Sequence, residues 1–189
     1  IIDLLYTQSN LQEVLDRENF DTFSMEYYSG SHIDRLTGRS SREAMEIALK
    51  SCHEFVDTFG EEFHNLLLYG DTGVGKTFLS HCIAKELLEH SFSVIYFTAA
   101  QLFDIFARST FRREEEAGAD CEHIYSCDLL IIDDLGTEMS NSFTNSQLFI
   151  CLNERILRKK PTLISTNLSL EDLKNIYSER IFSRITSSY

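Results

Sequence analysis

Basic residues are scarce in this chain of 189 residues, which has 17 lysines and arginines against 30 aspartates and glutamates. A protein that binds nucleic acid through its whole surface needs a broad positive footprint, so the formal net charge of −13 disfavours that class. The acidic excess is confined to residues 1–140, because residues 141–189 hold four acidic and seven basic side chains. The composition therefore allows a local basic site near the C-terminal end but argues against general electrostatic binding.

Long hydrophobic runs are absent as well. The longest charge-free stretch in the middle of the chain, 91–103, is shorter than the roughly 20 residues of a membrane-spanning helix and contains serine, threonine and glutamine. We therefore expect a soluble, cytoplasmic protein with no membrane partner. The chain opens on Ile1 rather than on methionine, and we expect it to be a piece of a longer protein that is truncated at its C-terminal end.

Cysteine pairs of the C-x-x-C type are also missing. The number of cysteines, five, is odd and their spacing is irregular, so the sequence does not indicate a disulfide framework. Cys121, His123 and Cys127 lie close together in the sequence, but their spacing does not match a zinc-binding pattern and a fourth ligand is missing. We therefore expect buried free thiols in a reducing compartment, at Cys52, Cys82, Cys121, Cys127 and Cys151.

Turn-forming residues are sparse, since proline occurs once, at Pro161, and three of the eight glycines fall within 70–75. Apolar residues recur at helical spacing over 4–17 and over 40–59, and short apolar runs then alternate with helical segments. We expect the polar interval 108–127 to be an exposed extension of the helix before it. The alternation predicts an α/β domain with a parallel sheet buried on both faces, with strands at 66–69, 94–97, 129–132 and 162–164 and helices at 76–90, 100–113 and 145–159.

A phosphate-binding loop is the most specific signal in the sequence. The segment 70–77 reads GDTGVGKT, fits the pattern G-x-x-x-x-G-K-[ST], and lies between a predicted strand and a predicted helix. Glycines let the backbone turn with positive φ, so that backbone N–H groups and the helix N-terminus converge on phosphate oxygens. The lysine adds a positive charge, and the threonine hydroxyl can ligate Mg²⁺. We therefore expect a nucleoside triphosphate to bind at Gly70, Asp71, Thr72, Gly73, Val74, Gly75, Lys76, Thr77 and Phe78.

Two carboxylates, Asp133 and Asp134, directly follow the predicted strand at 129–132. A carboxylate at the C-terminal end of a strand faces the ligand crevice of an open parallel sheet. We expect Asp133 to hold Mg²⁺ together with Thr77, and Asp134 to polarise the attacking water. Glu138 is a second candidate for the latter role, because a glutamate is more usual there and an aspartate is one methylene shorter.

Polar residues beyond the last predicted strand complete the candidate site. The amide of Asn167, at the tip of that strand, could hydrogen-bond the γ-phosphate or the attacking water. Arg180 and Arg184 are four residues apart on one face of a predicted helix. Either arginine could form a surface ion pair, for example with Glu179 or Asp172, or could reach the phosphate site of a neighbouring subunit.

With these residues, the chain resembles AAA+ ATPases, and more closely the bacterial replicative-helicase loaders of the DnaC/DnaI type and the related IstB transposition ATPases. The resemblance extends from about residue 20 to residue 185. It rests on a combination, because the phosphate-binding (Walker A) and carboxylate (Walker B) motifs alone are shared by many families. The segments that carry it are 19–23 (NFDTF), 70–77, 96–99 (YFTA), 129–134 with Glu138, 153–155 (NER), 165–167 (STN), 179–180 (ER) and 183–185 (SRI).

The resemblance implies a P-loop NTPase fold, a three-layer αβα sandwich with strand order 5-1-4-3-2, whose fifth strand, after residue 185, we expect to be missing here. It also implies an N-terminal linker region over 1–40 and an AAA+ ATPase domain over 41–189. Asn167 would be the sensor-1 residue and Arg184 the arginine finger, with Arg180 as the other candidate. The aromatic segment at 19–23 would lie near the adenine.

The activity that the resemblance implies is ATP binding with Mg²⁺ and slow, partner-stimulated hydrolysis. It would serve the loading of a replicative DNA helicase in DNA replication, as a primosome component. The implied partners are that helicase, single-stranded DNA and a second copy of the chain, reached through Arg184. Three alternatives stay open: an IstB-like transposition helper that acts on duplex DNA, a nucleotide-gated binding module with little hydrolysis, and a small-molecule kinase. A kinase would need an acceptor pocket and an arginine-rich lid, and the sequence shows no sign of either.

Overall fold

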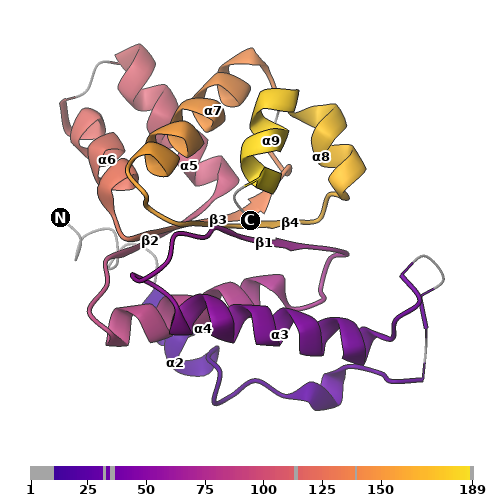
Figure 1. Ribbon diagram of the computed structural model, residues 1–189. Coiled ribbons are helices and arrows are strands. Elements are labelled where there is room, and N and C mark those ends of the chain that lie inside the picture. The colour runs from indigo at the N-terminus through magenta and orange to yellow at the C-terminus, as the bar shows by residue number, and fades with distance from the viewer. Residues whose placement is uncertain (1–10, 32, 35–36, 113–114, 139, 188–189) are drawn as a thin grey trace.

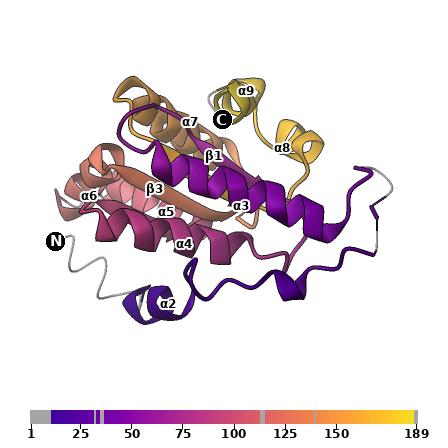
Figure 2. The same cartoon turned by 60° about the horizontal axis from the view of Figure 1, so that its bottom comes forward.

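A central parallel sheet lies between two groups of helices (Figure 1, Figure 2). The structure, a computed structural model, describes residues 11–31, 33–34, 37–112, 115–138 and 140–187. Within these ranges the three layers have the arrangement that the alternation of strands and helices predicts.

The sheet contains four strands in the order β1-β4-β3-β2, and every neighbouring pair is parallel. This result confirms the α/β class and the 1-4-3-2 part of the expected order. No further strand pairs with β1 in the described part of the chain. The strand bounds are Leu66–Tyr69 (β1), Val94–Thr98 (β2), Leu129–Leu135 (β3) and Thr162–Thr166 (β4).

Helices cover both faces of the sheet, as Figure 1 shows. One face carries α2 (Leu11–Arg17), α3 (Ser41–Asp57) and α4 (Lys76–Glu89), preceded by a short 3-10 turn, η1 (Met25–Tyr27). The other face carries α5 (Ala99–Ala107), α6 (Glu115–Ser126), α7 (Ser142–Leu157), α8 (Leu170–Ile176) and α9 (Glu179–Ser187). The helix predicted over 4–17 is seen from residue 11, because residues 1–10 lie outside the described ranges. None of the helices in the described ranges combines the length and the apolar character needed to cross a membrane.

The apolar strand β3 supplies both halves of the core. Leu129 and Ile131 pack with α3 and α4, whereas Leu130 and Ile132 pack with α5 and α7 on the opposite face. All four side chains are fully buried. Successive side chains of a strand point to opposite faces, so an unbroken apolar run is what a sheet covered on both sides requires.

The helix α7 begins three residues before its predicted start at 145. The reason is a capping interaction, in which the Asn141 side chain accepts hydrogen bonds from the N–H groups of Phe143 and Thr144. Such a cap satisfies N–H groups that have no partner within the helix and so fixes where the helix starts.

The predicted helix over 100–113 is shorter in the structure. The helix α5 stops at Ala107, and a π-helical turn, η2, follows over Arg108–Arg112. The polar interval beyond is not simply an exposed extension of α5, because it forms a separate helix, α6, whose end is buried. Ile124 is 1% exposed and Cys127 is 7% exposed, and both pack into the core. The expectation of an exposed segment is therefore wrong at this end.

All five cysteines are free thiols, and four of them are buried. Burial raises the pKa of the Cys52 thiol and of the Cys151 thiol to about 12. Because a thiolate is the reactive form of cysteine, these groups are inert packing residues at neutral pH.

Candidate functional site

The phosphate-binding loop connects β1 to α4. Gly70, Gly73 and Gly75 have φ values of 142°, 79° and 101°, in the region that favours glycine. Gly75 is the N-cap of α4, and no side chain caps this helix end, so the first N–H groups of α4 are available to an anion. A Cβ atom at Gly73 would meet no atom within 4 Å, whereas one at Gly75 would lie 2.5 Å from the Tyr28 hydroxyl. The loop therefore has the open, N–H-lined shape of a phosphate cradle.

The lysine of the loop lies at the centre of the site. Lys76 is 8% exposed, and its Nζ donates to the carbonyl oxygens of Gly70 (2.9 Å) and Asp71 (2.7 Å) and to Oδ1 of Asn167 (2.7 Å). Burial lowers the pKa of Lys76, and the negative charges of Asp134, Asp133 and Asp71 oppose that shift. The fold thus brings Asn167 to Lys76 across 91 residues of sequence.

The carboxylate of Asp133 lies beside the first turn of α4. It is 3% exposed, and the Thr77 hydroxyl donates to its Oδ2 over 3.0 Å. Two further hydroxyls, of Tyr96 and Ser165, donate to Oδ2 and Oδ1 of the same carboxylate. A hydroxyl and a carboxylate side by side are the oxygen ligands that Mg²⁺ prefers. The two residues expected to hold the metal are therefore adjacent.

Asp134 lies at an irregularity in β3, where the register with β4 shifts between Ile132 and Leu135. Its backbone has a φ of 55°, and its N–H donates to the Ser165 hydroxyl over 3.0 Å. A non-glycine residue with positive φ is uncommon and often marks a functional position. The negative charge of Asp134 opposes the lowering of the Lys76 pKa more strongly than the charges of Asp133 and Asp71 do.

Glu138, the second candidate for water activation, is engaged elsewhere. Its Oε2 accepts the N–H of Gly136 over 2.8 Å, and its Oε1 accepts the hydroxyl of Tyr177, which follows α8. Burial and the bond to Glu138 raise the pKa of Tyr177. These contacts hold the Glu138 side chain to the loop after β3 and to the α8 end rather than to Lys76.

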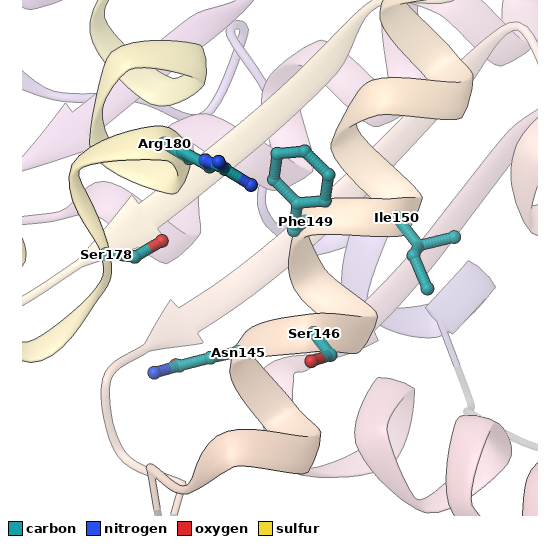
Figure 3. Close-up of a pocket in the computed structure, with 6 residues that line it drawn as sticks. All are labelled: Asn145, Ser146, Phe149, Ile150, Ser178 and Arg180. Atoms are coloured by element: carbon teal, nitrogen blue, oxygen red, sulfur yellow. The ribbon is translucent and has the colours of Figure 1, made fainter.

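The two candidate arginines lie on α9 against α7. Arg184 donates to Oδ1 of Asn153 over 3.2 and 2.9 Å and to the carbonyl of Arg180, and its guanidinium carbon is 4.2 Å from the centre of the Phe149 ring. Arg180 is exposed and points toward Phe149 across a pocket of about 450 Å³ (Figure 3). In the described part of the chain, neither arginine is bonded to Lys76 or Asp133.

Aromatic residues from the segment before α3 cover the outer side of the loop. The Tyr28 hydroxyl donates to the carbonyl of Val74 over 3.1 Å. The Phe23 ring stacks with Tyr28 and meets Phe78 edge to face, with ring centres 5.9 and 5.7 Å apart. The aromatic segment predicted to lie near the base thus contacts the first turn of α4 through Phe23, while Tyr28 contacts the phosphate-binding loop.

Sequence reasoning missed the roles of Tyr28, Tyr96 and Ser165. The predicted strand order could have indicated Tyr96 and Ser165. It places β2 and β4 on either side of β3, and these two strands bring Tyr96 and Ser165 to the carboxylate of Asp133. For Tyr28 the sequence carries no comparable signal, since its contact with Val74 joins residues 46 positions apart.

The fold and the site together define a P-loop nucleotide-binding domain of the AAA+ class. The chain belongs to the family described as IstB-like ATP binding protein, whose model matches residues 38–185. The resemblance in the sequence is therefore confirmed at the level of the family.

The relatives of the chain are replication proteins. It is 26% identical over 182 residues to the replicative helicase loader DnaC of Escherichia coli strain K12, a match that covers 90% of this chain and 73% of DnaC. A crystal structure of the DnaC helicase loader is similar in fold, with a TM-score of 0.72, 24% identity and coverage of 93% of this chain and 96% of that chain. AMPPCP-bound DnaA from Aquifex aeolicus has a TM-score of 0.71 at 20% identity, over 92% of this chain and 48% of that chain. The homology is thus to replication-related AAA+ proteins.

Proposed function

We propose that this protein is an ATP-dependent loader of a replicative DNA helicase. The main support is the match to DnaC, which runs along 90% of the chain. Helicase, single-stranded DNA and further copies of the chain are the partners that this role requires. The acidic composition of the chain agrees with DNA binding at a local site rather than through a broad positive surface.

The proposed nucleotide is ATP with Mg²⁺, and the residues present fit both groups. The N–H groups of 70–77 and the Lys76 ammonium would hold the phosphates, and the oxygen atoms of Thr77 and Asp133 would hold the metal. When bound there, Mg²⁺ would supply positive charge that neutralises the phosphates. Hydrolysis needs in addition a group that orients water and a group that senses the terminal phosphate.

We assign the first of these tasks to Asp134 and the second to Asn167. Asp134 lies in the site and its carboxylate accepts no side-chain bond among the described residues, whereas Glu138 is occupied by Tyr177 and Gly136. Asn167 already lies within hydrogen-bonding distance of Lys76 and so can contact the same phosphate. An aspartate in place of the longer glutamate agrees with slow turnover that a partner stimulates.

The test of the function uses the replicative helicase of the same host. In the presence of ATP, we expect the chain to co-purify with the hexameric helicase and to increase the amount of helicase placed on single-stranded DNA. Helicase loading should require nucleotide, because in this proposal the occupancy of the phosphate site controls assembly with the partners. A chain that binds no helicase and loads none, under conditions where it binds ATP, would refute the proposal.

A second candidate is a transposition helper, which the family match to IstB-like proteins favours. This role requires duplex DNA and a transposase in place of single-stranded DNA and a helicase. The two functions are separated by measuring the ATPase rate with helicase and single-stranded DNA, and then with transposase and duplex DNA. Only the partners of the true function should accelerate hydrolysis.

Replacing Arg184 by alanine should leave ATP binding within about twofold of the wild type but reduce hydrolysis in the assembled complex by at least about tenfold, as expected for an arginine finger. Arg180→Ala tests the other candidate, which is exposed rather than held by Asn153. Arg158→Ala is the matched control, because this arginine, the C-cap of α7, pairs with Glu122 and Glu154. Normal hydrolysis by the assembled Arg184 variant would show that the finger lies elsewhere.

A further inference from the structure

Asp133 is held by more than the groups that the proposed mechanism uses. Its carboxylate is almost fully buried, and both of its oxygens accept hydrogen bonds from hydroxyl groups. An ionised carboxylate can only accept hydrogen bonds, so Thr77, Tyr96 and Ser165 all act as donors toward it. Burying a charge without such partners would be costly. The three hydroxyls therefore decide which way the carboxylate faces.

Among the three donors, Tyr96 is the one free of another task in the site. Thr77 is itself a metal ligand in the proposed site, and its oxygen would turn from the carboxylate to the metal. Ser165 also accepts the N–H of Asp134 and so supports the irregular end of β3. Tyr96 lies on the neighbouring strand β2, and its hydroxyl contacts Oδ2 of Asp133 over 2.5 Å.

We infer that Tyr96 is a positioning residue that orients the Asp133 carboxylate for Mg²⁺. The inference rests on the proposed function, in which Asp133 and Thr77 hold that ion. Hydrogen bonds from surrounding groups commonly fix the orientation of metal-binding carboxylates, and their loss typically lowers metal affinity by about 10- to 100-fold. The same mechanism here predicts a specific defect in the use of Mg²⁺.

The phenol of Tyr96 is itself fixed in place. Its ring lies against the ring of His81 on α4, with centres 5.1 Å apart, and Nδ1 of His81 is 2.6 Å from Oε2 of Glu18. Glu18 directly follows α2, which lies beside α4 (Figure 2). A chain of contacts therefore runs from the N-terminal segment through His81 and Tyr96 to the carboxylate of Asp133.

Tyr96 stays protonated, as a donor must. Burial, together with the negative charge of Asp133 and the hydrogen bond to it, raises the pKa of the Tyr96 hydroxyl. An unperturbed tyrosine titrates near pH 10, so a hydroxyl is available to donate at physiological pH.

The test removes only the hydroxyl, in Tyr96→Phe, which keeps the ring and its contact with His81. The readout is the affinity for a fluorescent ATP analogue, measured in EDTA and during a titration with MgCl₂. We expect the affinity in EDTA to change by less than about twofold, while the Mg²⁺ concentration that gives half of the Mg²⁺-dependent effect rises about tenfold. Tyr125→Phe is the matched control, since this partly buried tyrosine packs on Phe106 and Arg158 and should behave like the wild type.

Each possible result decides the inference. Equal Mg²⁺ dependence in the wild type and Tyr96→Phe would overturn the positioning role while leaving the proposed function intact. Weakened binding in EDTA, or a lowered unfolding temperature that Tyr125→Phe does not share, would show that Tyr96 has only a structural role. Nucleotide binding that is insensitive to Mg²⁺ in the wild type would overturn both the inference and the proposed metal site.

Discussion

Replacing Lys76 by alanine will abolish ATP binding at concentrations that saturate the wild type. The ammonium of Lys76 is the only lysine or arginine charge that the described contacts place at the phosphate-binding loop, where it is bonded to two loop carbonyls and to Asn167. Removing one partner of a buried charge pair typically costs about 2–5 kcal/mol, so we expect the dissociation constant to rise about 30-fold or more. Titration calorimetry or a fluorescent nucleotide gives the measurement.

The matched control for this prediction is Lys85→Ala, on the same helix α4. Lys85 forms ion pairs with Asp16 and Glu89, both at more than 3.4 Å and partly exposed. Such pairs contribute little, so its affinity for ATP should stay within about twofold of the wild type. If Lys76→Ala bound ATP as Lys85→Ala does, the loop would not be the nucleotide site.

Replacing Arg155 by methionine will lower the free energy of unfolding by about 3 kcal/mol, a large share of the roughly 5–15 kcal/mol that folded domains have. Arg155 is fully buried on α7 and donates to the carbonyls of Ile124, Cys127 and Pro161 and to the Thr162 hydroxyl. Methionine fills a similar volume but supplies none of these donors, and a buried acceptor that is left unpaired costs about 1–3 kcal/mol. The Pro161 carbonyl keeps a second donor, the N–H of Leu130. The substitution also removes the desolvation cost of the buried positive charge, but this gain offsets only part of that loss.

Urea unfolding measures this effect, with Arg158→Met as the control. Arg158 is the C-cap of the same helix but forms ion pairs with Glu122 and Glu154 at the surface, which are typically worth less than about 1 kcal/mol. A cost for Arg155→Met no larger than that of Arg158→Met would mean that water or backbone movement satisfies the buried carbonyls.

Local patterns in the sequence were enough to predict the strands, the parallel sheet and the phosphate-binding loop. Each of these features depends on neighbours in sequence: the apolar run of β3, the glycines at 70–75, the alternation of runs and helices. The placement of Asp133 beside Thr77 followed from one more rule, that carboxyl ends of parallel strands meet at one edge of the sheet.

The remaining features depend on contacts between distant residues. Nothing near Glu138 in the sequence indicates that Tyr177, 39 residues away, will bind its carboxylate. The end of α5 at Ala107 and the buried end of α6 depend on packing against the core, which local polarity does not reveal. Arg155 belongs to a polar triplet that gives no sign of complete burial. The roles of side chains that contact a neighbouring strand or another layer could therefore be found only from the structure.

The contact between Tyr28 and the phosphate-binding loop joins the segment before α3 to the candidate nucleotide site. Phe23 and Tyr28 precede α3, yet they cover Phe78 and bind the carbonyl of Val74. A chain shortened to begin at residue 41 would keep every residue of the Walker A and Walker B motifs. It would lose the aromatic contacts of Phe23 and Tyr28, and Phe78 would become more exposed to water. The contacts of the candidate site therefore begin ahead of residue 41, and Asn19 ties the same segment to α2, since its buried amide donates to the carbonyls of Leu15 and Asp16.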